Sequence, residues 1–93
     1  MKFRYDLVKN ASLLQKRGIG FEEIITAIEN GNLLDVVDHY NSKKYPTQKI
    51  MFVRILLEVY VVPCVIEEND TFFLKTCFPS RKARKVFLEG EDE

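Results

Sequence analysis

The chain has 93 residues, of which 46% are hydrophobic, and it carries 14 acidic and 14 basic residues. This length is typical of one small domain, so we expect a single domain over residues 1–93 with an ordered core of about residues 2–88. The hydrophobic content excludes an intrinsically disordered chain. Two cysteines are too few for a disulfide-based scaffold.

The sequence shows no targeting or membrane segment. The first ten residues alternate charged and apolar side chains, unlike a secretory signal peptide. The longest apolar stretch, residues 50–66, is interrupted by two charged residues and Pro63, so it is too polar to cross a bilayer. We therefore expect a soluble, cytoplasmic protein without membrane association, in which Cys64 and Cys77 are buried or half-buried reduced thiols.

The first half of the chain predicts a short strand, two helices and a longer strand. Alternating charged and aromatic residues over 2–5 suit a strand, and Asp6 can cap the helix that follows. That helix ends at Gly18, after two basic residues that interact favourably with the helix dipole. A stripe of one phenylalanine and three isoleucines predicts a second helix, which ends at Gly31. Residues 33–40 are rich in Leu and Val and predict a strand.

The second half predicts strands that are separated by polar turns. Residues 50–66 are long enough for two strands, so we expect a turn near residues 55–58 although no Gly or Asn marks it. Pro63 predicts that the second of these strands is an edge at that point or is bulged. We also expect a polar loop, a polar turn, a further strand and a C-terminal helix at residues 41–47, 67–71, 72–78 and 81–88, respectively.

This order of elements indicates an α+β fold. In such a fold, the two N-terminal helices pack on one face of a mainly antiparallel sheet of about four to five strands, and a short C-terminal helix follows. The sequence contains no repeat, low-complexity segment or linker that would suggest a second domain.

The sequence lacks the motifs of most enzymes that use a nucleotide, a metal or a covalent nucleophile. One histidine and two separated cysteines do not suit a zinc site, so we predict no metal and no cofactor. The basic residues are concentrated in two groups instead. The first comprises Lys43, Lys44 and Lys49 around Tyr45, and the second comprises Lys75, Arg81, Lys82, Arg84 and Lys85.

Both basic groups are candidates for contact with nucleic acid. The first combines cations with a stacking surface, as sites for single-stranded nucleic acid do. Beside it, His39 ends a predicted strand and titrates ordinarily near neutral pH, so general acid–base action is conceivable. Arg81 and Lys82, at the start of the predicted C-terminal helix, could meet a phosphate. A hydrogen-bonded strand-end histidine and solvated lysines are the structural alternatives, and the sequence leaves them open.

Several short motifs occur in an order that resembles the BrnT-like toxin family of bacterial type II toxin–antitoxin systems. Tyr5-Asp6 precedes the first helix, and residues 16–23 read Lys-Arg-Gly-Ile-Gly-Phe-Glu-Glu. Further matches, some to a subgroup often found beside a small ribbon-helix-helix antitoxin, are His39, Asn41, Lys44-Tyr45-Pro46, Gln48, Val61-Val62-Pro63 and Pro79-Ser80-Arg81-Lys82-Ala83. The order agrees over residues 3–87, whereas Arg17 stands where better-known members have His.

The resemblance implies a sheet with helices similar to the RelE-type ribonuclease toxins and a ribbon-helix-helix-type antitoxin as partner. It also implies metal-independent endoribonuclease action on mRNA, and contact with DNA only indirectly through the antitoxin complex. Such cleavage requires phosphate orientation, charge neutralisation and proton transfer. The candidate catalytic residues are His39, Lys44, Arg81 and Lys82. The candidate RNA-binding residues are Lys16, Arg17, Tyr45, Gln48, Lys49, Lys75 and Arg84.

Two functional hypotheses follow. The first is a toxin that cleaves or blocks mRNA, and its nuclease form requires Lys44, His39 and Arg81 to converge on one concave spot. If they lie on unrelated faces, the second hypothesis applies: an interaction module that binds an antitoxin without cleaving RNA. Residues 55–57 would suit a protein interface if they form an exposed turn, and otherwise belong to the core. A DNA-binding regulator lacks support, because the helix from Phe21 carries no Lys or Arg.

Overall fold

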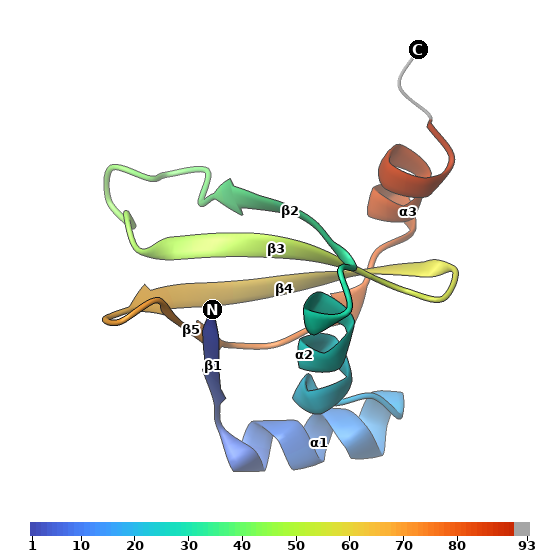
Figure 1. Cartoon of the computed structure of the whole chain (residues 1–93), viewed down its shortest axis with the longest axis horizontal. Helices are drawn as coiled ribbons and strands as arrows, with labels where there is room; N and C mark the ends of the chain where they lie inside the picture. Colours follow the sequence, from blue (N-terminus) through green and yellow to red (C-terminus); the bar gives the residue numbers. More distant parts are fainter. Residues whose placement is uncertain (91–93) are drawn as a thin grey trace.

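The computed structural model describes residues 1–90, which form three helices and a mixed, six-stranded sheet (Figure 1). Two helices follow the first strand and precede the rest of the sheet, and a short helix ends the fold, so the predicted α+β class is confirmed. The elements in chain order are β1 (Lys2–Tyr5), α1 (Leu7–Arg17), α2 (Phe21–Glu29), β2 (Leu33–Asp38), β3 (Gln48–Ile55), β4 (Glu58–Glu67), β5 (Thr71–Leu74), β6 (Phe78–Pro79) and α3 (Arg81–Leu88).

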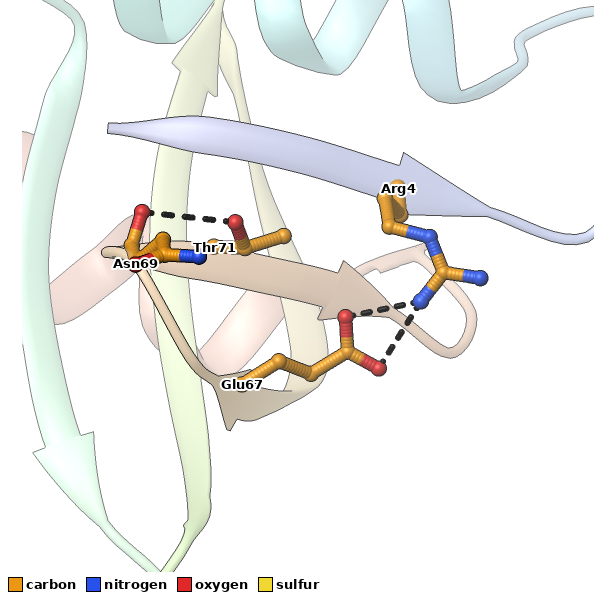
Figure 2. A network of polar contacts seen from close by, with 4 residues as sticks. All are labelled: Arg4, Glu67, Asn69 and Thr71. Atoms are coloured by element: carbon orange, nitrogen blue, oxygen red, sulfur yellow. Dashed lines mark hydrogen bonds and ion pairs between the residues drawn. The ribbon is translucent and has the colours of Figure 1, made fainter.

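The sheet has the strand order β1-β5-β4-β3-β2, and β6 pairs with β4 beside this path. β1 is parallel to β5, whereas all the other pairs are antiparallel. Side chains also hold the β1 edge, because Arg4 Nη1 lies 2.7 and 2.9 Å from the two carboxylate oxygens of Glu67 on β4 (Figure 2). In the turn between β4 and β5, Thr71 Oγ1 donates to Asn69 O at 3.4 Å (Figure 2).

Local hydrogen bonds define the ends of the two N-terminal helices. Asp6 caps α1, because its Oδ1 accepts hydrogen bonds from two backbone N–H groups of the first turn, at 2.7 and 3.3 Å. α1 ends at Gly18, whose φ of 73° lies in the left-handed region that favours glycine. At the start of α2, Glu23 Oε1 accepts from Gly20 N–H at 2.9 Å, and the next N–H donates to Asn10 Oδ1 at 2.7 Å. These bonds tie α2 directly to α1.

The main core lies between the N-terminal helices and one face of the sheet. α2 contributes Phe21 and Ile24, and β3 contributes Met51 and Val53, and all four are fully buried. The two β3 residues are separated by one position because successive side chains of a strand point to opposite faces. The other buried members of this core are Leu13, Ile19, Ala27, Val62, Cys64, Phe72, Leu74 and Cys77.

The opposite face of the sheet is partly covered by α3. Phe52 lies between Met51 and Val53 along β3 and therefore points away from the main core. Its ring centroid lies 5.0 Å from that of Phe87 on α3. Ala83 of α3 is buried as well, and α3 contacts β4. α3 thus forms a second layer on the other side of the sheet from α1 and α2.

β3 and β4 form a hairpin whose tip consists of Leu56 and Leu57. The turn lies where the sequence predicts it, between the paired residues Ile55 and Glu58. Leu56 is 85% exposed and Leu57 is 72% exposed, so the alternative that they belong to the core is wrong. Leu56 has a φ of 56°, a left-handed conformation that costs an L-residue about 1–2 kcal/mol. Hairpin turns usually place Gly or Asn at such a position.

The structure confirms the first of the two alternatives for Pro63. β4 pairs with β3 through Pro63 without a bulge, and no described strand pairs with Pro63 on the other side, so β4 is an edge at that point although it is central in the sheet. The proline is tolerated because β5 pairs with one part of β4 and β6 with another, so no strand needs its missing N–H. The strand predicted over residues 72–78 is split into β5 and β6. Lys75 N–H still donates to Pro63 O at 2.9 Å in the register of β4 and β5, but Pro63 has no N–H to donate in return, so the ladder ends there. The sheet therefore has six strands rather than four or five.

Candidate functional site

The loop between β2 and β3, residues 39–47, carries the first basic group at the end of the sheet far from the β3–β4 hairpin (Figure 1). Tyr45 N–H donates to Asn41 O at 2.9 Å, and Gln48 N–H donates to Tyr45 O at 3.2 Å. His39 N–H donates to Gln48 O at 3.1 Å and closes the loop. These backbone bonds give the loop a defined conformation on which side chains can gather.

Three aromatic rings and one lysine, His39, Tyr40, Lys44 and Tyr45, form what we call the aromatic–basic cluster. The ring centroids of His39 and Tyr40 lie 4.4 Å apart in a stacked arrangement, and those of His39 and Tyr45 lie 4.8 Å apart. Lys44 Nζ lies 5.4 Å from the centroid of the Tyr45 ring, a cation–π distance. Tyr40 is 94% exposed and was missed by the sequence analysis, although it adjoins His39 in the chain.

His39 is held by its own loop. Its Nδ1 accepts a hydrogen bond from Asn41 N–H at 3.0 Å, so the proton of the neutral ring lies on Nε2. The hydrogen-bonded strand-end histidine, one of the two alternatives for this residue, is therefore present in the structure. Nε2 is the atom through which His39 could exchange a proton with a ligand.

Lys49 and Gln48, at the start of β3, are less available to a ligand than the sequence suggests. Lys49 Nζ forms an ion pair with the Asp38 carboxylate across the β2–β3 pair. A lysine that is balanced by a nearby carboxylate attracts a phosphate less strongly. Gln48 is half-buried in the sheet. Lys43 and Lys44, which are both exposed, are the remaining cations of this end.

The second basic group, apart from Lys75, lies on α3 at the hairpin end of the sheet. Arg81 and Arg84 line a small hollow together with Glu58, the first residue of β4. Arg84 Nη1 lies 3.8 Å from a Glu58 carboxylate oxygen, and Arg84 Nε lies 3.4 Å from Glu89 in an ion pair without hydrogen-bond geometry. Ser80 Oγ accepts a backbone N–H of α3 at 3.0 Å. An anion at this hollow would thus compete with two carboxylates for Arg84.

The two basic groups do not converge. His39 is hydrogen-bonded to Gln48 at the first residue of β3, whereas Arg81 lies beside Glu58, just past the last residue of β3. β3 has eight residues, and at about 3.3 Å per residue its ends lie roughly 23 Å apart. Figure 1 shows the 39–47 loop and α3 at opposite ends of the strands. The convergence of Lys44, His39 and Arg81 that a nuclease centre requires is therefore absent.

The other predicted RNA-binding residues are dispersed as well. Lys16 and Arg17 form the last turn of α1, and both are exposed on the helical layer. Lys75 is exposed between β5 and β6, and Lys82 is exposed in the first turn of α3. The structure brings together only the residues of the 39–47 loop and its flanks, and it leaves the rest on separate surfaces.

The cysteines are buried thiols, as predicted, and do not suit nucleophilic chemistry. Burial raises the pKa of Cys64 to about 11 and also raises the pKa of Cys77. The reactive thiolate form is therefore scarce near neutral pH. Within residues 1–90, no group of three or more His, Cys, Asp or Glu side chains is arranged to hold a metal ion.

A groove that the sequence analysis did not predict lies between α1, α2 and the β3–β4 hairpin. It has a volume of about 840 Å³. Its apolar lining comes from all three elements, and we call it the leucine groove after Leu14, Ala27, Ile55 and Leu56. The acidic residues Glu22 and Glu23 of α2 also line it, and both are exposed. The signal in the sequence was the pair of leucines at the expected turn.

Comparisons of this chain with protein-family models, with curated proteins and with solved structures found no match. The resemblance to the BrnT-like toxins therefore depends on the short sequence motifs alone. No helix within the described residues is long and apolar enough to span a membrane. A fold alone does not define an activity. The aromatic–basic cluster and the leucine groove are the two surfaces of this chain that bear on its function.

Proposed function

We propose that this chain is the toxin-side component of a bacterial, cytoplasmic type II toxin–antitoxin pair, and that it acts as a protein-interaction module that binds a ribbon-helix-helix-type antitoxin. The observation that supports this proposal is the pair of exposed leucines at the hairpin tip, beside the leucine groove. Large apolar side chains that are grouped at the surface favour a protein interface. Contact with DNA would come only through the antitoxin.

Endoribonuclease action on mRNA has less support from the geometry. Cleavage needs phosphate binding, charge neutralisation and proton transfer at a single phosphodiester. Arg81 and Lys82 lie about a strand length away from His39, and Lys49 is already paired with Asp38. Among residues 1–90, the predicted catalytic groups thus do not form one centre.

A second candidate function is binding of single-stranded mRNA by the aromatic–basic cluster. The exposed ring of Tyr40, stacked on His39, offers a face to a nucleobase, and Lys44 can contact the adjoining phosphate. Stacking of a base on an aromatic side chain contributes about 1–3 kcal/mol. A protein that binds mRNA in this way would block translation without cutting the message.

Expression experiments separate these functions. We expect the chain to copurify with a small ribbon-helix-helix protein encoded beside it and to leave purified mRNA intact. Failure to form that complex would contradict the proposed function. Growth arrest by the chain alone that is relieved by Tyr40→Ala with Lys44→Ala, at equal abundance, would favour RNA binding at the cluster. Relief by Arg81→Ala with Lys82→Ala would instead restore the nuclease hypothesis.

A further inference from the structure

We propose that the leucine groove binds an amphipathic helix of the partner protein, with large aliphatic side chains on the buried face and Lys or Arg along one flank. The inference rests on the proposed function and names the segment of the partner that the groove fits. Four features support it: the apolar lining of the groove, the geometry of the hairpin tip, the charge of the groove and the pairing of the nearby strands.

The apolar lining is shared by three elements and is open to solvent. Leu14 on α1 is 45% exposed, and Leu56 at the hairpin tip is the most exposed leucine of the described residues. Buried Ala27 of α2 and partly buried Ile55 of β3, which also belong to or pack on the main core, complete the apolar lining. Single exposed leucines are ordinary, whereas a group that borders a groove marks an interaction site. Side chains at helical spacing on a partner would meet such a lining.

The hairpin tip presents a leucine at a position where the backbone disfavours one. Leu56 has a positive φ, and its carbonyl oxygen accepts a hydrogen bond from Arg54 Nε at 2.9 Å, which holds the turn in place. A glycine would form the same turn without strain. Strained, exposed residues occur where function requires them, and the function of an aliphatic side chain is apolar contact. Leu56 is thus suited to contact a partner rather than to stabilise the fold.

The charge of the groove selects a basic partner. α2 carries Glu22, Glu23 and Glu29 and no Lys or Arg. Among the described residues, Glu22 and Glu23 line the groove, and Arg54 is the one cation in its lining, so the lining holds two carboxylates against one guanidinium. A segment with Lys or Arg beside its apolar face would be attracted to these carboxylates, whereas an acidic segment or a nucleic acid backbone would be repelled.

The pairing of the strands favours a helix over an extended peptide. An extended segment binds by adding to a free strand edge, because its backbone groups need partners. β3, the strand that lines the groove, is already paired with β2 and β4, and Arg54 N–H donates to Asn32 O at 2.9 Å. Within residues 1–90, the nearby free edge of the sheet is that of β2, whose residues do not line the groove. A helix satisfies its own backbone hydrogen bonds and offers only side chains, which is what this groove can accept.

The test uses the full chain and two synthetic peptides of about 18 residues, roughly five helical turns. Both peptides carry Leu at i, i+3, i+4 and i+7 spacing, and one has Lys on the flank whereas the other has Glu. Fluorescence anisotropy should show at least about tenfold tighter binding of the Lys peptide. Leu56→Gly should weaken that binding about tenfold, the effect of one buried leucine, while raising the melting temperature.

Matched controls distinguish the groove from the surface in general. Val86→Ser removes an exposed aliphatic side chain from α3, on the other face of the sheet, and should change the affinity less than about twofold. Glu22→Gln should weaken binding of the Lys peptide, whereas Glu68→Gln, in the turn between β4 and β5, should not. Equal affinity of Leu56→Gly and the unaltered chain, or preference for the Glu peptide, would overturn the inference.

The same variants, measured against the full-length ribbon-helix-helix protein, separate this inference from the proposed function. A complex that tolerates both Leu56→Gly and Glu22→Gln would overturn the groove assignment and leave the proposed function intact. Binding of the Lys peptide without any complex would support the groove chemistry and contradict the antitoxin as partner. Self-association of the chain that Leu56→Gly abolishes would assign the groove to a second copy and overturn the inference.

Discussion

Leu56→Gly should stabilise the protein although it removes a large apolar side chain. Leu56 is 85% exposed, so the substitution gives up little buried surface. The left-handed backbone costs a leucine about 1–2 kcal/mol, and glycine avoids that cost. Glycine loses about 0.5–1 kcal/mol more conformational entropy on folding. The net gain lies between about 0 and 1.5 kcal/mol, and its midpoint of about 0.75 kcal/mol corresponds to a rise of roughly 3–6 °C in melting temperature for a domain of this size.

Thermal unfolding followed by circular dichroism measures this effect, with Leu57→Gly as the matched control. Leu57 is the neighbouring tip residue and is 72% exposed, but it does not have a positive φ. Glycine there brings only its entropy cost, so we expect a fall of about 0.5–1 kcal/mol in the free energy of unfolding. A lower melting temperature for Leu56→Gly, or equal shifts for the two variants, would refute the strain argument.

Three further predictions concern the helix cap, the helix contact and the buried thiol. Asp6→Ala should lower the free energy of unfolding by about 1 kcal/mol in urea, because two N–H groups of α1 lose their acceptor; an unchanged midpoint would contradict the cap. Gly20→Ala should cost about 1–3 kcal/mol in thermal unfolding, because its Cβ would lie 2.5 Å from Asn10 Oδ1, and an unaffected melting temperature would show that the helices can separate. The folded-state pKa of Cys64, about 11, lies above its ordinary value of 9.0, so the unfolded thiol loses its proton first as the pH rises. In the unaltered chain, the part of the free energy of unfolding that this thiol contributes should be complete below about pH 9 and fall towards pH 11. The Cys64→Ala control should lack this fall.

Elements with local signals were predictable from the sequence. Asp6 and Gly18 mark the ends of α1 through hydrogen bonds and backbone conformation that involve only neighbouring residues. The break between β5 and β6 had no such signal, because residues 72–78 have strand-like composition throughout. Its cause is a distant residue, Pro63 on β4, which accepts a hydrogen bond from Lys75 N–H but has no N–H with which to continue the ladder. Pro63 correctly indicated a local edge of β4, but the sequence did not show that separate strands, β5 and β6, pair with β4 on either side of that gap.

The candidate site shows that a list of cations does not give their positions in the fold. The sequence analysis grouped His39 with Arg81 by chemistry, yet antiparallel strands alternate in direction, so their ends alternate between the two ends of a sheet. His39 follows β2, whereas Arg81 follows β5 and β6, which places them at opposite ends. Residues close in sequence, such as Tyr45 and Lys44, came together as predicted. Counting the strand reversals along the sequence is enough to separate Arg81 from them.

The parallel pairing of β1 with β5 affects how this chain folds during its synthesis. Lys2 pairs with Thr71 and Tyr5 with Leu74, so β1 leaves the ribosome long before β5, the strand that it needs to join the sheet. Until then, α1 and α2, which are already capped by their own residues, expose their apolar faces to solvent. A newly made chain is therefore exposed to aggregation or to capture by a binding partner for most of its synthesis, and shortening it before residue 71 should leave β1 without a place to dock.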